Sequence, residues 1–339
     1  MAPETEALQA STKGRALTAS SHHSSSPAGI PSWIAVDWGT SNLRVWAMGD
    51  SADILAEAQS PLGMNAIAGD DKLSFEGVLV GLIDGWLAPD ARDVPVVICG
   101  MAGAKQGWRE APYCDVPASS SDLAHGAVNP NVRDPRITVS ILPGLCQRED
   151  ADVMRGEETQ LVGFMKQNPD FAGWVCLPGT HSKWARVADG KITGFRTYMS
   201  GEVFALLSQN SILRHSVGDD WDDAAFADAI RAAKAQPSGF LHSLFTVRAG
   251  ALVAREGQAV PSGVAVLSGT VIGAEIADVL GLLQMDEEIA LIGAGKLASL
   301  YQEALAVHGH KATPMDGTSI TLAGLTQARQ VLTNASQRN

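Results

Sequence analysis

The chain has 339 residues, 45% of them hydrophobic, and a formal net charge of -12 at pH 7. This length is sufficient for two ordinary domains with a large buried core, so disorder is not the default expectation. An acidic chain is atypical of nucleic-acid binders, which cluster Lys and Arg, so we expect small-molecule partners and no nucleic acid. The four cysteines form no C-x-x-C pair, which favours reduced thiols in a cytoplasmic protein over disulfides or a zinc site.

The ends and the hydropathy of the chain indicate no membrane partner. No apolar run approaches the roughly 20 residues that cross a bilayer. Residues 1–31 are rich in Ser, Ala and His and lack the apolar segment of a secretory signal. We therefore predict a disordered N-terminal extension there.

The order of predicted elements is that of a mixed α/β protein. Three strands, WIAVDW, LRVWAM and ILAEAQS, precede a helix predicted over 72–88 and a buried strand, VPVVICG, that ends in the turn GMAG. A helix is predicted within 149–167. The strands GWVCL and KWARV then repeat the opening pattern, and beyond residue 200 the chain is mostly helical apart from the strand-like run IALIGAG.

The first hairpin, VDWGTSNLR, has a tip suited to a polyanion. Its glycine allows close backbone approach, and its neighbours add N–H and hydroxyl donors. The candidate phosphate ligands are Gly39, Thr40, Ser41 and Asn42. Asp37 at the strand end is a candidate Mg²⁺ ligand, and Arg44 is a candidate for stabilising charge on a transferred phosphoryl group. Taken alone, the same letters also describe a plain turn.

A second hairpin, LPGTHSKW, repeats the Gly-Thr dipeptide of the first. Its candidate phosphate ligands are Gly179, Thr180, His181 and Ser182. Two such hairpins predict a duplicated core, in which the two tips face each other across a cleft and hold the inner and outer phosphates.

Several separated motifs together resemble one family. They are VDWGTSNLR, ICGMAGAKQGW, DVMRGEETQLVG, LPGTHSKW, LSGTVIGAE and LIGAGKLASLY, and they span about Trp33 to Leu332. The sequence resembles the 2-dehydro-3-deoxygalactonokinase family, within the superfamily of actin, sugar kinases and chaperone ATPases. The resemblance implies a two-lobed actin-like ATPase (ribonuclease H-like) fold with duplicated mixed sheets and an interlobe nucleotide cleft. It places an N-terminal lobe at 32–148, a C-terminal lobe at 149–332 and a tail at 333–339.

By the same resemblance, the two hairpins bind ATP phosphates, Asp37 is the magnesium-site carboxylate, and a late glycine pair contacts the adenosine. The implied adenosine-binding residues are Gly293, Ala294, Gly295 and Leu297. The pattern Gly-x-Gly-x-x-Ala after a strand also matches a dinucleotide fingerprint, with Asp316 near the position of the ribose carboxylate. The chain ends at residue 339, too soon after Asp316 to build the remaining strands of such a half.

The catalytic base is expected in the turn GEETQ. Phosphoryl transfer to a hydroxyl is helped by a carboxylate that accepts the hydroxyl proton, and in related sugar kinases an aspartate in a Gly-Asp-Gln-type turn has this role. Glu157 occupies the same place in chain order, with glutamate in place of aspartate, and Glu158 and Asp152 stay open as substitutes. Carboxylates at a helix N-terminus also have a purely structural explanation, because the helix dipole favours negative charge there.

The substrate site is expected after the GMAG turn. Lys105 and Gln106 offer donors for a carboxylate, and the indole of Trp108 offers a face for a sugar. The implied reaction is transfer of the γ-phosphoryl group of MgATP to the 6-hydroxyl of 2-dehydro-3-deoxy-D-galactonate in galactonate catabolism, with ATP and Mg²⁺ as cofactors. A kinase of another sugar acid or keto-sugar, and a non-metabolic ATPase module, are the alternatives; a homodimer stays open.

Overall fold

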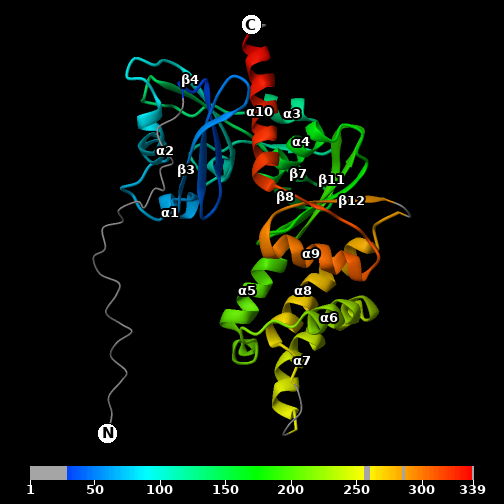
Figure 1. Cartoon of the computed structure of the whole chain (residues 1–339). Helices are drawn as coiled ribbons and strands as arrows, with labels where there is room; N and C mark the ends of the chain where they lie inside the picture. Colours follow the sequence, from blue (N-terminus) through cyan, green and yellow to red (C-terminus); the bar gives the residue numbers. More distant parts are fainter. Residues whose placement is uncertain (1–28, 256–259, 285–286, 338–339) are drawn as a thin grey trace, which may run out of the picture.

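The computed structural model describes residues 29–255, 260–284 and 287–337. Two lobes, each built on a five-stranded sheet, lie on either side of the last helix, α10 (Figure 1). The strands of the N-terminal lobe sheet are β1 (Trp33–Trp38), β2 (Leu43–Met48), β3 (Ile54–Ser60), β4 (Val94–Gly100) and β6 (Ile137–Ile141). Those of the C-terminal lobe sheet are β9 (Gly173–Leu177), β10 (Ser182–Ala188), β11 (Lys191–Tyr198), β12 (Glu288–Ile292) and β13 (Pro314–Met315).

The two large sheets have the same topology. Their strand orders are β3-β2-β1-β4-β6 and β11-β10-β9-β12-β13. In each, the first three strands form an antiparallel meander, and the remaining two run parallel to the central strand. The duplicated core is therefore confirmed, and the protein has the actin-like ATPase fold that the sequence predicts.

Helices cover the faces of both sheets. The α-helices are α1 (Met64–Ala68), α2 (Phe75–Ile83), α3 (Ser120–His125), α4 (Glu157–Gln167), α5 (Ser200–Asn210), α6 (Asp223–Ala235), α7 (Phe240–Val253), α8 (Gly263–Leu280), α9 (Gly295–Val307) and α10 (Gly317–Ser336). In the described part of the chain, 3₁₀ turns accompany them at Asp84–Trp86, Met101–Gly103, Ile212–His215 and Pro237–Gly239. A third sheet, of order β5-β7-β8, consists of β5 (Tyr113–Asp115), β7 (Gly144–Gln147) and β8 (Asp152–Met154).

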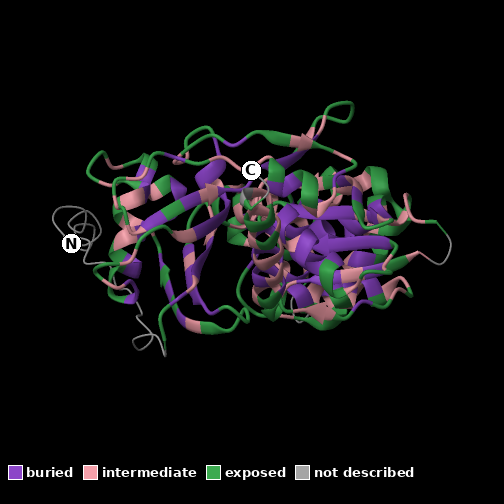
Figure 2. Cartoon of the chain, turned by 90° about the horizontal axis from the view of Figure 1, so that it is seen from above, coloured by how far each residue is buried: buried purple, intermediate pink, exposed green. Residues whose placement is uncertain are grey.

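Alternation along β1 shows why these strands are buried on both faces. Ile34 and Val36 pack into the core beneath α2, whereas Trp33 and Ala35 face a second cluster that includes Leu325 of α10. Successive side chains of a strand point to opposite faces, so a strand covered by helices on both sides must be apolar throughout. Figure 2 shows the resulting concentration of buried residues in the two sheets.

Helix α10 belongs to both halves of the molecule. It packs on α4 of the C-terminal lobe, on β1 of the N-terminal lobe, and on α3, whose Leu123 packs into the core of the C-terminal lobe (Figure 1). The predicted boundaries at 32–148 and 149–332 stay a prediction, and α10 continues past 332 to Ser336. The predicted extension at 1–31 lies almost wholly outside the described residues.

The predicted helix within 149–167 is only partly correct. Residues 152–154 form strand β8, which pairs with β7, and the helix begins at Glu157. Gly156 has φ of 109°, a conformation outside the helical region that glycine adopts readily. The break places Glu157 in the first turn of α4.

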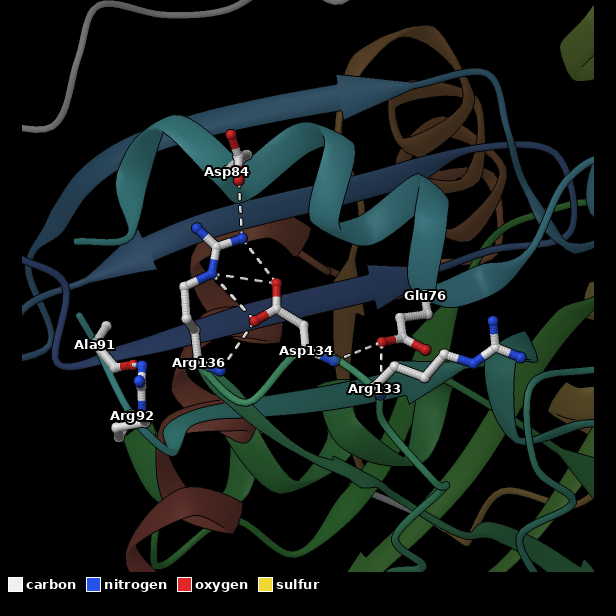
Figure 3. A network of polar contacts seen from close by, with 7 residues as sticks. All are labelled: Glu76, Asp84, Ala91, Arg92, Arg133, Asp134 and Arg136. Carbon is white, nitrogen blue, oxygen red and sulfur yellow. Dashed lines mark hydrogen bonds and ion pairs between the residues drawn. The ribbon is translucent and has the colours of Figure 1, made fainter. Parts of the chain in front are cut away.

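A polar network fastens α2 to the segment before β6 on the outside of the N-terminal lobe (Figure 3). Arg136 contacts Asp84 at 2.8 Å and Asp134 at 2.7 Å. The hydrogen bonds from Arg136 hold the pKa of Asp134 below its ordinary value. Glu76 of α2 accepts hydrogen bonds from the backbone N–H groups of Arg133 and Asp134. None of these residues lines the cavity described below.

Helix α8 has the length and hydropathy of a membrane span, and it is the one such helix among residues 29–255, 260–284 and 287–337. It packs between α6, α7 and α9, and 61% of it is buried, which is the environment of a core helix. All four cysteines are free, and three are buried, as the sequence predicts.

Candidate active site

The two hairpins meet at one cavity of about 400 Å³. Asp37, Gly39 and Thr40 line it from the N-terminal lobe, and His181 and Lys183 line it from β10 and the turn before it. We call this the active-site cavity. Its remaining lining consists of Trp38, Gly100, Met101, Tyr113, Val153, Met154, Arg155, Gly156, Glu157, Gln160 and Thr321.

The tip of the first hairpin is held by helix α1. The backbone N–H groups of Met64 and Asn65 donate to the carbonyls of Gly39 and Thr40, both at 3.1 Å. A Cβ at Gly63 would lie 2.4 Å from the carbonyl carbon of Ser41, so only glycine permits this approach. Ser41 and Asn42 are exposed and lie outside the cavity lining, and their proposed phosphate contacts stay predictions.

Asp37 and Arg44 are register partners across β1 and β2. The Arg44 Nη2 lies 2.5 Å from Asp37 Oδ2, and Nη1 donates to Thr318 of α10 at 3.2 Å. Asp37 lines the active-site cavity, whereas Arg44 does not. In this structure the Arg44 guanidinium balances the charge of the Asp37 carboxylate. The role of Arg44 toward a transferred phosphoryl group stays a prediction.

On the second hairpin, alternate side chains have opposite surroundings. The side chain of Lys183 is 5% exposed; its Nζ lies 3.2 Å from Glu157 Oε1 and donates to the His181 carbonyl at 3.1 Å. His181 Nε2 pairs with Glu202 Oε2 at 2.5 Å. The buried hydroxyl of Ser182 instead contacts the hydroxyl of Tyr301 at 2.7 Å, so it faces away from the cavity.

Of the three candidate bases, only Glu157 lines the active-site cavity. Its side chain is 28% exposed and pairs with Lys183. Asp152 is engaged elsewhere, because it accepts hydrogen bonds from the N–H and the hydroxyl of Thr197 at 2.7 Å each. The geometry therefore favours Glu157 over Asp152.

Glu158 is fully buried and faces away from the cavity. Desolvation, followed by the negative charge of Glu157, raises its pKa to about 8. Its carboxyl oxygens accept from the Gly156 N–H at 2.6 Å and the Thr159 hydroxyl at 3.1 Å. A carboxyl that keeps its proton at pH 7 and does not reach the cavity is poorly suited to be the base.

A second cavity, of about 370 Å³, also borders the second hairpin, at Gly179. We call it the apolar pocket. Its lining is mostly apolar and aromatic: Gly179, Ser200, Gly201, Phe204, Trp221, Val264, Ser268, Val271, Ile272, Lys296, Leu297, Leu300 and Tyr301. Such a lining suits the flat, largely apolar face of a base.

A buried carboxyl connects the walls of the apolar pocket. Glu275 of α8 accepts hydrogen bonds from Trp184 of β10 at 2.7 Å, Tyr301 of α9 at 2.7 Å and Ser200 of α5. Burial raises its pKa above the ordinary value. Four elements around the second hairpin thus share one acceptor, which fixes their mutual positions.

Of the four predicted adenosine residues, one lines this pocket, and the roles of all four stay predictions. Leu297 lines it, whereas Gly293 and Ala294 connect β12 to α9, and Gly295 begins that helix with φ of 67°. Asp316, the ribose candidate of the dinucleotide alternative, caps α10 by accepting from the Ser319 N–H at 2.7 Å. Helix α10 follows it directly.

Comparison with known proteins identifies the family of this chain. A family model described as 2-keto-3-deoxy-galactonokinase matches residues 37–328. The chain belongs to this family. A Rhizobium meliloti (strain 1021) protein named as a probable 2-dehydro-3-deoxygalactonokinase is 40% identical over 306 residues, which cover 88% of this chain and 97% of that protein. The 2-dehydro-3-deoxygalactonokinase of Escherichia coli (strain K12) is 33% identical over 306 residues, covering 89% and 99%.

A solved structure supports the fold. The crystal structure of a candidate 2-dehydro-3-deoxygalactonokinase from Sinorhizobium meliloti superposes with a TM-score of 0.81 at 40% identity, covering 88% of this chain and 99% of that one. This member of the 2-keto-3-deoxy-galactonokinase family is therefore a kinase.

The three substrate residues predicted for this galactonokinase-family chain do not line the active-site cavity. Lys105 and Gln106 are exposed. Trp108 instead stacks on Phe75 with ring centroids 6.3 Å apart, and it meets the edge of Trp38 at 6.4 Å. Its indole is part of the N-terminal core.

Sequence reasoning missed several polar residues that line the active-site cavity, among them three inside the quoted motifs: Arg155, Gln160 and Lys183. Each lies inside a motif that the sequence already singled out. Strand alternation offered a signal for Lys183, because residues 181 and 183 share one side of β10. Arg155 and Gln160 carried no comparable signal.

The residues at the first hairpin fit a Mg²⁺ ion that is held mainly by nucleotide phosphates. Asp37 contributes one cavity-lining carboxylate, and the described part of the chain holds no group of three or more His, Cys, Asp or Glu side chains able to cage a metal. Mg²⁺ commonly binds one or two carboxylates together with phosphates and water. Asp37 is the residue that would hold it.

Proposed function

We propose that this protein transfers the γ-phosphoryl group of MgATP to the 6-hydroxyl of 2-dehydro-3-deoxy-D-galactonate, giving the 6-phosphate in galactonate catabolism. One observation carries the proposal: Glu157 and both hairpins line the same cavity, beside an apolar pocket of suitable size for an adenine. The names of the relatives at 40% and 33% identity support the choice of acceptor.

In the proposed reaction the acceptor hydroxyl oxygen attacks the γ-phosphorus, and the bond from this phosphorus to the oxygen it shares with the β-phosphate breaks. The hydroxyl proton passes to the Glu157 carboxylate, and ADP leaves. Mg²⁺, when bound, neutralises charge on the phosphates. The transfer depends mainly on positioning and on charge, which the hairpins and Lys183 supply.

Lys183 has two functions in this proposal. Its ammonium lies 3.2 Å from Glu157 Oε1, so the ion pair orients the Glu157 carboxylate at the cavity wall. Because Lys183 also lines the cavity, its positive charge is available to phosphoryl oxygens.

The test is ADP release from MgATP by the purified protein. The acceptors are 2-dehydro-3-deoxygalactonate, its gluconate epimer, a panel of neutral sugars and no acceptor, and ³¹P NMR identifies the phosphorylated hydroxyl. We expect turnover on the galactonate compound, and we expect Glu157→Gln to lower kcat by about 100-fold or more, the usual contribution of a general base.

Comparator variants separate the three carboxyl groups. Asp152→Asn and Glu158→Gln should keep kcat within about threefold of wild type if Glu157 is the base, since loss of the true base costs at least about 100-fold. Preferred turnover on another acid or keto-sugar would reassign the substrate. ADP release that needs no acceptor would instead indicate an ATPase module.

A further inference from the structure

Arg155 is a charged residue that lines the active-site cavity and that the proposed reaction does not yet use. Arg155 lies between β8 and the Gly156–Glu157 turn and lines the cavity. Its guanidinium carbon lies 4.4 Å from the centre of the Tyr113 ring, and Nη2 donates to the Ala111 carbonyl at 2.9 Å. Stacking and one hydrogen bond therefore hold the guanidinium in place.

Most of its hydrogen-bonding capacity is unused. A guanidinium has five N–H donors, yet Nε and Nη1 are buried without any hydrogen-bond partner. Leaving buried donors unpaired costs free energy, and more so when the group is charged. Glycine at position 103 leaves room for the Arg155 side chain, because a Cβ there would lie 2.8 Å from Nη1.

The charge of Arg155 is also not balanced. Asp37, Glu157, Lys183 and His181 all line the cavity and each has an ion-pair partner, whereas Arg155 has none among the described residues. The Glu158 carboxyl interacts electrostatically with Arg155, but its pKa of about 8 keeps it neutral at pH 7. The cavity therefore contains an arginine that lacks an anion.

We propose that Arg155 binds the carboxylate of the sugar-acid acceptor, an inference that rests on the proposed function. A planar guanidinium matches the geometry of a carboxylate and can bind it through two N–H donors. Nε and Nη1 are buried in the ligand-free protein, so binding requires the guanidinium to turn away from Tyr113 and expose these donors to the cavity, and the new ion pair replaces the contact with Tyr113. Arg155 thus selects acids over neutral sugars, a role that the exposed Lys105 cannot fill from outside the cavity lining.

The experiment compares two acceptors that differ only in charge, 2-dehydro-3-deoxygalactonate and its C1 carboxamide. For Arg155→Gln we expect kcat/KM to fall by about 100-fold with the acid, and to stay within about threefold of wild type with the amide. KM for ATP should stay within about threefold of the wild-type value. Arg155→Lys keeps the positive charge but lacks the planar pair of donors. Its kcat/KM for the acid should therefore lie between those of wild type and Arg155→Gln.

Two further variants control the comparison. Arg133→Gln removes an exposed arginine of the N-terminal lobe that lies outside the cavity (Figure 3), and it should keep the wild-type ratio of acid to amide. Lys105→Gln tests the sequence-based prediction that Lys105 binds the substrate carboxylate. If this variant loses the wild-type preference for the acid over the amide, the assignment to Arg155 is wrong.

Other results also decide the question. An Arg155→Gln enzyme that keeps the wild-type ratio, or that loses both acceptors equally, would refute the carboxylate role. If Arg155→Gln does not fold, Arg155→Lys carries the same comparison. A wild-type enzyme that phosphorylates neither acceptor refutes the proposed function itself, and this is seen before any variant is measured.

Discussion

Replacing the buried Glu158 by glutamine should make the stability of this kinase less dependent on pH. The folded protein keeps the Glu158 proton up to a pKa of about 8, whereas the unfolded chain releases it near the ordinary value of 4.5. Between these values the folded state binds more protons than the unfolded state, so the free energy of unfolding falls as pH rises. Glutamine has a similar shape and does not titrate.

The size of the effect follows from the two pKa values. Each pH unit inside the window changes the free energy of unfolding by up to about 1.4 kcal/mol. Between about pH 5.5 and 7.5, the wild type should therefore lose about 2.5 kcal/mol relative to Glu158→Gln.

Urea unfolding followed by tryptophan fluorescence at three pH values in this range measures the difference. Urea is uncharged and does not screen the ion pairs around Glu157. Glu149→Gln, at an exposed position of the preceding loop, is the matched control and should follow the wild type. Stability curves for wild type and Glu158→Gln that stay parallel across the range would show that the Glu158 carboxyl is not held protonated by burial.

Two further predictions concern the second hairpin. Lys183→Met should lower kcat by about 100-fold in steady-state kinetics, because it removes a positive charge from beside the reacting phosphates and Glu157. The control is Lys166→Met, at an exposed position at the end of α4. An unchanged kcat in Lys183→Met would contradict the role of Lys183. Gly201→Ala places a Cβ 2.5 Å from the Gly179 carbonyl oxygen, so it should cost about 1–3 kcal/mol of stability and raise KM for ATP. Gly250→Ala in α7, where a Cβ meets nothing within 4 Å, should not destabilise; thermal unfolding in which both variants behave alike would refute the steric argument.

The sequence alone determined the features that depend on neighbours along the chain. Apolar strands around a Gly-Thr turn specify each hairpin locally, and the recurrence of this unit predicted the duplicated core. Glu157 became the candidate base through the resemblance to related sugar kinases, by its place in chain order, and this role stays a prediction. The periodicity of 72–88 also located α2, because a helix that covers a sheet must present an apolar face.

Only the tertiary structure decided which polar side chains share the active-site cavity. Strand β8 pairs with the nearby β7, which in turn pairs with β5 from earlier in the chain, so residues that local periodicity predicted as helix join a sheet. Trp108 looked suited to a sugar face, yet long-range packing placed it against Phe75. The contact of Lys183 with Glu157 and the unpaired guanidinium of Arg155 arise where separate strands and helices meet. Burial and distance between such elements set the charges of a site, and neither is encoded in the spacing of residues along one segment.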